Sequence, residues 1–372
     1  MEERAERATR AIVDLSAIAA NVAGVRRRVG PSPHVMAVVK ADGYGHGAVP
    51  VARAALASGA DWLGVALPEE GEELRRAGLT APIVVLGLIQ PEEAPKVVGA
   101  GLDQAVASEE LVVALARAAA RAKEVAHVHL KVETGMGRIG VAPEEAVPLA
   151  RRIARENGLV LRGVFSHLAT ADKADKTFAR EQLARFEVAI SALKEAGIEV
   201  PLRHIANSAA ILDLPEATYD MVRPGTMMYG LPPSDEVSQS VPLRPAMTFV
   251  TRVAAVQSVP TGISISYGRT FTTKRRSVIA TLPLGYADGL SRRLSNRWEV
   301  SLRGARVPLV GTICMDMCMA DVTDLGGVER GEEVVLFGKT PSATEMAERL
   351  GTINYEVVCA VGKRVPRVYL GT

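Results

Sequence analysis

A lysine near the start of the chain follows a short apolar segment and precedes a glycine-rich turn. Segment 35–39 is branched and apolar, which is typical of a buried strand, and Lys40 is followed by glycines at positions 43, 45 and 47. Lysine is rarely buried without a partner, whereas glycine lets the backbone turn sharply or approach a ligand closely. The pattern indicates an amine at the mouth of a pocket, suited to forming a Schiff base. The competing interpretation is a strand-end lysine that reaches water beside a flexible turn.

Further polar or flexible residues stand at or directly after the ends of later apolar segments. They include cations, an imidazole, an amide, hydroxyls and a glycine: Lys131, Arg138, His167, Asn207, Ser208, Arg223, Gly225 and Thr226. A lysine combined with hydroxyls and backbone N–H donors suits an aldehyde that carries a phosphate. This combination predicts pyridoxal 5′-phosphate, with Lys40 on the aldehyde, His167 against the ring and Arg223 facing the ring nitrogen. Taken singly, a satisfied strand-end histidine and a salt-bridged arginine are ordinary residues.

The elements that must position these residues are eight strand-like segments alternating with helix-like segments. The strand-like segments are 35–40, 62–66, 83–86, 104–107, 128–132, 163–166, 202–206 and 220–223. Glycines stand where the intervening helices should end, at Gly59, Gly78, Gly101, Gly158 and Gly197. The alternation predicts a (β/α)₈ barrel, in which active sites lie at the C-terminal ends of the strands. A doubly wound open sheet is the alternative.

The pattern changes after Tyr229, where turn residues at 231–235 indicate a domain boundary. Beyond it, alternating segments and turn signals predict a mainly β second domain with one short helix at 342–350. The strand-like segments include 246–257, 276–282, 298–302 and 332–337. We therefore expect a barrel over 14–232, a β domain over 233–372, and an N-terminal segment, 1–13, associated with the β domain.

Composition excludes several classes of protein. The 372 residues include 44 basic and 42 acidic side chains, a balance that argues against a nucleic-acid or membrane footprint. Cys314, Cys318 and Cys359 are too few for a disulfide framework, and we expect the first two to be buried thiols rather than metal ligands. The charged segment 1–10 lacks the apolar core of a secretory signal, and no apolar run reaches the length of a membrane span. These features predict a soluble, cytoplasmic protein.

Several segments together resemble the alanine racemase family. Residues 39–47 are similar to the cofactor-binding signature of that family, which related single-domain proteins carry in shorter versions. Further similar segments follow in the family's order across both predicted domains, at 131–140, 223–225, 266–271, 284–289, 314–316 and 353–356. Because the likeness extends over nearly the whole chain, it is far more specific than the lysine motif alone.

The resemblance implies a racemase that interconverts L- and D-alanine and supplies D-alanine for cell-wall peptidoglycan. It implies a homodimer with shared active sites, pyridoxal phosphate as the cofactor and no metal. Racemisation needs a base on each face of the cofactor. The resemblance assigns these roles to Lys40, which carries the Schiff base, and to Tyr267 of the partner chain. Free lysine and tyrosine have pKa values of about 10.4 and 10, so the site must lower both.

The resemblance also assigns the remaining site residues. Those implied at the phosphate are Tyr44, Ser208, Gly225, Thr226 and Tyr355. Those implied at the substrate are Arg138 and Tyr286, with Met315 and Asp316 from the partner chain. Arg223 is implied at the pyridine nitrogen, and Lys131 is expected to carry a carbamate that orients Arg138. Two positions depart in type from the family pattern, since Thr226 stands where a bulkier aliphatic residue is common and Glu133 where aspartate is frequent.

Four alternatives stay open. A racemase of serine or of a broader set of amino acids is possible within the same family. A pyridoxal-phosphate carrier needs no second base, and a decarboxylase of related fold is expected to need an acidic partner where Arg223 stands. His127 and His129, followed by Lys131, are compatible with a metal-dependent hydrolase.

Overall fold

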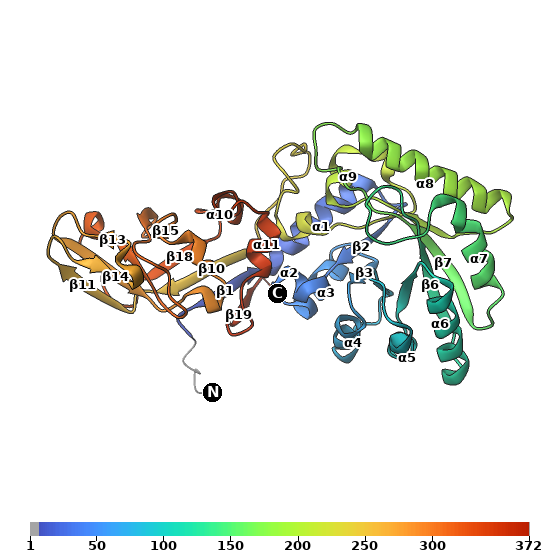
Figure 1. The fold of residues 1–372 in the computed structure, drawn as a ribbon, viewed down its shortest axis with the longest axis horizontal. Helices are drawn as coiled ribbons and strands as arrows, with labels where there is room; N and C mark the ends of the chain where they lie inside the picture. Colours follow the sequence, from blue (N-terminus) through green and yellow to red (C-terminus); the bar gives the residue numbers. More distant parts are fainter. Residues whose placement is uncertain (1–6, 372) are drawn as a thin grey trace. The chain divides into compact units, whose positions relative to one another are not determined.

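A computed structural model describes residues 7–371, so residues 1–6 of the predicted N-terminal segment and residue 372 lie outside the described part. The chain divides into two compact units (Figure 1). The barrel unit comprises residues 18–43 and 48–244, and the described residues of the β unit are 7–17, 44–47 and 245–371. The divisions after 17 and 244 lie 4 and 12 residues beyond the predicted boundaries after 13 and 232. The sequence did not predict that residues 44–47 group with the β unit.

Eight parallel strands form the barrel unit. They are β2 (His34–Val38), β3 (Trp62–Val65), β4 (Ile83–Val85), β5 (Asp103–Val106), β6 (Ala126–Lys131), β7 (Leu159–Phe165), β8 (Leu202–His204) and β9 (Met221–Val222). Their spatial order is β8-β7-β6-β5-β4-β3-β2-β9. The N–H of Arg223 donates to the Ala206 carbonyl (2.9 Å), and the N–H of Asp220 donates to the Arg203 carbonyl (3.1 Å). These bonds bring the two ends together, so the sheet is a nearly closed barrel, as predicted, and not an open doubly wound sheet.

Helices flank the strands of this unit, as Figure 1 shows for α3 to α8. The helices are α1 (Leu15–Val29), α3 (Ala48–Ala57), α4 (Pro68–Arg76), α5 (Ala94–Gly99), α6 (Glu109–Ala122), α7 (Ala146–Ala154), α8 (Thr177–Glu195) and α9 (Ser208–Asp213). Helix α6 illustrates why they form. Its buried residues include Leu111, Leu115 and Ala119, which recur every four positions, and the Ser108 side chain caps its first turn. The five glycines predicted to end helices all have positive φ.

The barrel interior begins with an apolar layer. Met36, Trp62, Val84, Leu202 and Met221 come from five different strands and form one buried cluster. Such layers of side chains from several strands fill the interior of this class of barrel. The layer makes the barrel a packed core rather than a pore.

The described residues of the β unit form three sheets. Their orders are β16-β15-β18-β10-β1-β19, β11-β14-β17 and β12-β13. The strands are β1 (Arg10–Asp14), β10 (Met247–Arg252), β11 (Ala255–Val259), β12 (Ser264–Ile265), β13 (Phe271–Thr272), β14 (Ser277–Leu282), β15 (Glu299–Leu302), β16 (Ala305–Pro308), β17 (Cys318–Asp321), β18 (Glu333–Phe337) and β19 (Arg367–Leu370). The mainly β character is as predicted, although segment 246–257 forms two strands.

Strand β1 lies between β10 and β19, antiparallel to the first and parallel to the second. The unit also contains the predicted helix, α10 (Ala343–Leu350), and a second one, α11 (Asn354–Cys359), that was not predicted. Within residues 7–371, no helix is both long enough and apolar enough to cross a membrane.

Candidate active site

Lys40 is followed by a turn whose backbone is left-handed. Strand β2 ends two residues before it, so the predicted strand 35–40 is too long, and Lys40 begins α2 (Lys40–Tyr44). Ala41, Asp42 and Gly43 have φ values of 53°, 53° and 59°. A left-handed conformation costs roughly 1–2 kcal/mol for each residue that has a Cβ. The turn is therefore held in place by its surroundings rather than by its own preference.

Hydrogen bonds fix this turn. The Ala41 N–H donates to the Glu70 carboxylate (2.6 Å), and the Asp42 carboxylate accepts from the Ala48 N–H (2.8 Å). At Gly43, a Cβ would lie 3.3 Å from the Ala48 backbone. The turn after Lys40 is thus a specified structure and not a flexible one, which favours a defined position for the lysine.

Arg223 is a nearly buried cation whose partners carry no charge. Its side chain follows β9, and the residue is 5% exposed. Nη1 donates to His204 Nδ1 (2.8 Å), and Nη2 donates to the carbonyls of Ser166 (2.7 Å) and Ile205 (3.1 Å) and lies 3.4 Å from His167 Nδ1. Toward the residues that the structure describes, Nε makes no hydrogen bond. An arginine with a donor to spare suits a ligand atom that accepts a hydrogen bond.

Other cations lie around His167. The Lys131 Nζ and the Arg223 Cζ lie 5.3 Å and 5.5 Å from the centroid of the Phe165 ring. Burial and the charge of Arg223 lower the pKa of Lys131 to about 7, and burial and the charge of Arg138 lower the pKa of Arg223 to about 9. Burial and the charges of four cations lower the pKa of His167 well below its usual value. They are Arg223, Arg138, Lys131 and Lys40. This excess of positive charge favours an anionic ligand.

Hydroxyl and backbone N–H groups meet after β8 and β9. Ser208 is the first residue of α9, and the Asn207 side chain caps that helix by accepting one of its N–H groups (3.0 Å). The Ser208 hydroxyl accepts the N–H of Gly225 (2.8 Å). Thr226 directly follows and begins the short helix η4 (Thr226–Tyr229). The structure thus brings together four of the residues that the sequence assigned to the cofactor.

The loop that carries Arg138 is shaped by Glu133. The Glu133 carboxylate accepts the N–H groups of Gly135 (2.5 Å), Met136 (2.5 Å) and Arg138 (3.1 Å). Burial raises the pKa of Glu133, but these N–H donors outweigh it and hold the pKa below its usual value. Glu133 therefore acts as an anion that folds the loop, and the side chain of Arg138 stays exposed.

The predicted base Tyr267 and the predicted substrate residues of the β unit are all exposed. Tyr267, Tyr286 and Met315 are 73%, 42% and 52% exposed, and Asp316 is exposed as well. Large apolar side chains exposed together are typical of a surface that another molecule covers.

Short contacts join the three segments that carry these residues. The Thr312 hydroxyl donates to the Tyr267 carbonyl (2.7 Å), and the Tyr286 N–H donates to the Cys314 carbonyl (3.1 Å). A Cβ at Gly285 would lie 2.1 Å from the same carbonyl oxygen, so this approach requires glycine.

Tyr44 and Tyr355 also meet in the β unit. Their ring centroids are 6.4 Å apart at an interplanar angle of 72°. Burial, together with Cys359 and Tyr355, raises the pKa of Tyr44. The neighbouring Gly45 serves protein packing, since a Cβ there would lie 2.5 Å from the Val358 carbonyl oxygen.

The cysteines and the histidine pair do not form a metal site. Cys318 is buried as expected, but Cys314 is only partly buried, which corrects that expectation, and neither forms a disulfide. His129 contacts Asp103 and His204 instead of pairing with His127. No group of three or more His, Cys, Asp or Glu side chains among residues 7–371 is arranged to hold a metal ion.

Comparison with known families decides the relationship. The family model described as "Alanine racemase, N-terminal domain" matches residues 13–233, and "Alanine racemase, C-terminal domain" matches residues 246–369. The chain belongs to the alanine racemase family. This is a family of isomerases, so the chain is an enzyme of that class.

Individual relatives agree with the family match. The alanine racemase of Symbiobacterium thermophilum is 52% identical, with 98% of each chain covered. That of Desulfovibrio desulfuricans is 48% identical, covering 96% of this chain and 97% of the relative. Among solved structures, the alanine racemase of Clostridium difficile 630 matches with a TM-score of 0.96 at 37% identity, covering 99% of this chain and 97% of that one. The Bacillus anthracis alanine racemase with bound L-Ala-P matches with a TM-score of 0.93 at 39% identity, covering 98% and 96%.

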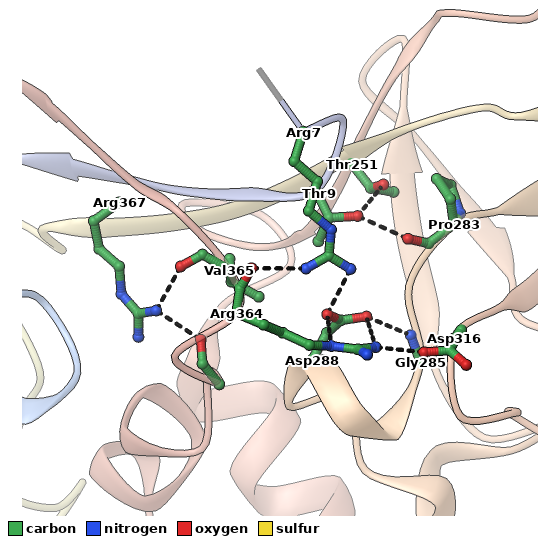
Figure 2. A network of polar contacts seen from close by, with 11 residues as sticks. Arg7, Thr9, Thr251, Pro283, Gly285, Asp288, Asp316, Arg364, Val365 and Arg367 are labelled. Atoms are coloured by element: carbon green, nitrogen blue, oxygen red, sulfur yellow. Dashed lines mark hydrogen bonds and ion pairs between the residues drawn. The ribbon is translucent and has the colours of Figure 1, made fainter. Parts of the chain in front are cut away.

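One polar network of this family member was not predicted from its sequence. Figure 2 shows Asp288, fully buried, accepting hydrogen bonds from Arg7 (2.7 Å), from Arg364 (2.7 and 3.0 Å) and from the Gly285 N–H (3.1 Å). Arg364 also donates to Asp316 (2.7 Å). Burial raises the pKa of Asp288, but the two arginines outweigh it and lower the pKa below its usual value. The network links the turn at Gly285 to the loop that carries Asp316. Contacts this distant in sequence leave no local pattern.

Replacing Asp288 with asparagine is expected to destabilise the β unit by about 2–3 kcal/mol, because two arginines lose a buried charged acceptor. Chemical unfolding of both variants measures the effect. Asp324→Asn is the matched control, since Asp324 pairs with Arg275 on the surface with 82% of its side chain exposed, and it should cost less than about 1 kcal/mol. Equal losses in the two variants would contradict this.

Lowering the pH is expected to destabilise the barrel unit through His167 and His204. Burial is the largest cause that lowers the pKa of each, followed by the charge of Arg223. The folded state keeps both imidazoles neutral, while the unfolded chain binds protons below a pKa of about 6.5. Because the unfolded state then holds more protons, the free energy of unfolding falls by about 1 kcal/mol per histidine between pH 6.5 and 5.5. Urea unfolding measures this, and the slope should be shallower in His204→Gln. If His204→Gln shows the same slope as the wild type, His204 does not contribute to the pH dependence of stability.

Proposed function

We propose that this chain is a pyridoxal-phosphate-dependent alanine racemase that works as a homodimer and supplies D-alanine for cell-wall peptidoglycan. Membership of the alanine racemase family over both domains supports this. The observation that carries the cofactor proposal is the buried Arg223, whose partners are imidazoles and carbonyls. Like Lys40 and Lys131, it lies close enough to His167 to lower the pKa of that residue. A carrier without catalytic activity accounts neither for this family membership nor for the exposed Tyr267.

The residues present fit pyridoxal phosphate. Lys40 would hold it covalently, His167 would lie against its ring, and Arg223 would donate to its ring nitrogen. The residues proposed for its phosphate are Tyr44, Ser208, Gly225, Thr226 and Tyr355. Asn207 is also proposed to bind the cofactor. The fit rests on charge and donors, since an anionic group matches the surplus of cations in the barrel unit, and the Arg223 Nε has no acceptor among the residues described.

Bound pyridoxal phosphate withdraws electrons from the α-carbon of an amino acid and so acidifies its α-proton. Arg223 moderates this effect, because a guanidinium has donors only and leaves the ring nitrogen unprotonated. A weaker electron sink disfavours side reactions such as transamination. This is also why a decarboxylase, for which an acidic partner is expected at that position, fits this site less well.

The proton is exchanged by two bases. We assign one face to Lys40 and the other to Tyr267 of the partner chain, because a single small base cannot easily reach both faces. Arg138 would hold the substrate, with Met315 and Asp316 of the partner chain, and Tyr286 would stand at the entrance to the site. The exposure of Tyr267, Tyr286 and Met315 supports a role at a surface that a second chain covers.

The direct test is conversion of pure L-alanine. Chiral chromatography should find equal amounts of L- and D-alanine at equilibrium, starting from either enantiomer, and L-serine in parallel separates the broader racemases from an alanine enzyme. A protein that binds the cofactor at Lys40 yet leaves both amino acids unchanged would be a carrier, and the proposal would fail.

Lys131 is expected to carry a carbamate. An amine with a pKa of about 7 is largely unprotonated just above neutral pH, and its nitrogen can add to carbon dioxide with loss of a proton to water. The product replaces a buried cation by an anion, which removes an unfavourable charge and can orient Arg138. Carbon-13 bicarbonate should give a carbamate signal that is missing in Lys131→Met. An ammonium group in crystals grown with carbon dioxide would oppose this.

A further inference from the structure

A chain of hydrogen bonds crosses the barrel interior from β5 to Arg223. Asp103 Oδ2 lies 3.1 Å from His129 Nε2, and His129 Nδ1 lies 2.9 Å from His204 Nε2. His204 Nδ1 in turn lies 2.8 Å from Arg223 Nη1. Asp103 is 3% exposed and both histidines are 0% exposed. Branched apolar side chains usually fill such a barrel, and buried polar groups cost free energy unless they are hydrogen-bonded. An unbroken polar chain in this place therefore points to a function.

Arg223 dictates the direction of every bond in this chain. A guanidinium only donates, so His204 Nδ1 must be the unprotonated acceptor and the proton of His204 must sit on Nε2. That proton is donated to His129, so His129 Nδ1 must be an acceptor and its own proton must sit on Nε2. The last donor, His129 Nε2–H, then meets Oδ2 of the Asp103 carboxyl group. Protonating either imidazole would set two donors against each other.

The surroundings hold each member of the chain in place. The His204 ring stacks on Phe165 with centroids 4.9 Å apart and an interplanar angle of 5°. His129 occupies the space left by Gly163, where a Cβ would come within 2.3 Å of Nδ1. Arg162 donates to both carboxylate oxygens of Asp103, at 3.0 and 3.1 Å. Burial, followed by the charge of Arg223, lowers the pKa of His204 well below its usual value, in agreement with a neutral ring.

We propose that Asp103 and His129 are positioning residues for Arg223, acting through His204 to fix where the guanidinium lies against the ring nitrogen of the cofactor. The inference rests on the proposed function for its link to the cofactor, whereas the direction of the chain rests on the barrel alone. A carboxylate at the far end polarises the two imidazoles, because hydrogen bonds in series strengthen one another. The bond that His204 accepts from Arg223 is thereby strengthened.

Nitrogen-15 labelling of histidine in the purified holoenzyme tests the direction of the chain. The protein has six histidines, and His129→Gln and His204→Gln assign the two signals. Both rings should carry a single proton, on Nε2. A proton on Nδ1 of either ring overturns the proposal. The measurement is made on the wild-type protein, and the two histidine variants serve only to assign the signals.

Substitutions at Asp103 test the positioning role. Asp103→Leu should lower kcat about 10-fold or more with little change in KM, and it should shift the signal of a nitrogen-15-labelled cofactor ring. Asp103→Asn should lower kcat less, because its amide oxygen can still accept the hydrogen bond from His129. The control is Asp61→Asn, a carboxylate paired with Arg26 whose side chain is 40% exposed; it should keep wild-type kcat.

An unchanged kcat and an unchanged ring-nitrogen signal in Asp103→Leu would overturn the positioning role. A wild-type protein that shows both predicted tautomers but no racemisation would reject the proposed function instead. The two failures are therefore distinguishable.

Discussion

Replacing Lys40 with alanine is expected to lower racemisation by at least about 10⁴-fold in both directions, because the change removes one base and the covalent hold on the cofactor together. The left-handed turn beside Lys40 should survive, since Ala41 and Asp42 are tied to Glu70 and Ala48 by hydrogen bonds that do not involve the lysine side chain. Loss of activity with an unchanged thermal midpoint would therefore report chemistry and not unfolding.

Borohydride reduction of the wild-type holoenzyme, followed by peptide mapping, locates the covalent bond independently. The label should lie on Lys40 and disappear in Lys40→Ala. Lys173→Ala is the control, since Lys173 forms a surface ion pair with Glu236 (3.1 Å) and should keep full activity. A label on another lysine would remove Lys40 from the proposed mechanism.

Replacing Tyr267 with phenylalanine is expected to lower racemisation by about 10²–10⁴-fold, the usual contribution of a positioned acid or base. The defect should affect proton exchange from one enantiomer and not from the other. In heavy water, Lys40 should still exchange the α-proton of one enantiomer, while exchange from the other is lost. Cofactor binding should persist, because the hydroxyl removed is not among the groups proposed to hold the cofactor.

Tyr219→Phe is the matched control for this substitution. The Tyr219 hydroxyl donates to Glu187 (2.5 Å) on a surface of the barrel unit, and its loss should leave turnover unchanged. Equal retention of exchange for both enantiomers in Tyr267→Phe would mean that Tyr267 is not a base.

The sequence predicts the barrel well because each strand and helix carries its own local signal. Eight short branched segments alternate with segments of helical periodicity, five of which end at glycines, and the nearly closed sheet contains the same number of strands. The local structure at Lys40 was less predictable. A glycine at 43 indicates a turn, but Ala41 and Asp42 adopt the same left-handed conformation. It is held by the hydrogen bond from the Ala41 N–H to the Glu70 carboxylate and by that from the Ala48 N–H to the Asp42 carboxylate.

The networks around the site escaped prediction for a related reason. His129 and Asp103 are 26 positions apart, and His129 and His204 are 75 apart. Their meeting depends on the closure of the barrel and on the space at Gly163. The sequence drew attention to His129 only as a metal ligand. A polar residue at a position where the barrel expects an apolar one was the available signal.

We propose that each active site combines Lys40 of one chain with Tyr267 of another. Mixing Lys40→Ala protein with Tyr267→Phe protein and allowing the subunits to exchange tests it most directly. Random exchange makes half of the dimers mixed, and each mixed dimer has one intact site of two, so roughly a quarter of wild-type activity should return if the sites are independent. Activity that stays at the level of the separate variants, although exchange is demonstrated, would show that both bases belong to the same chain.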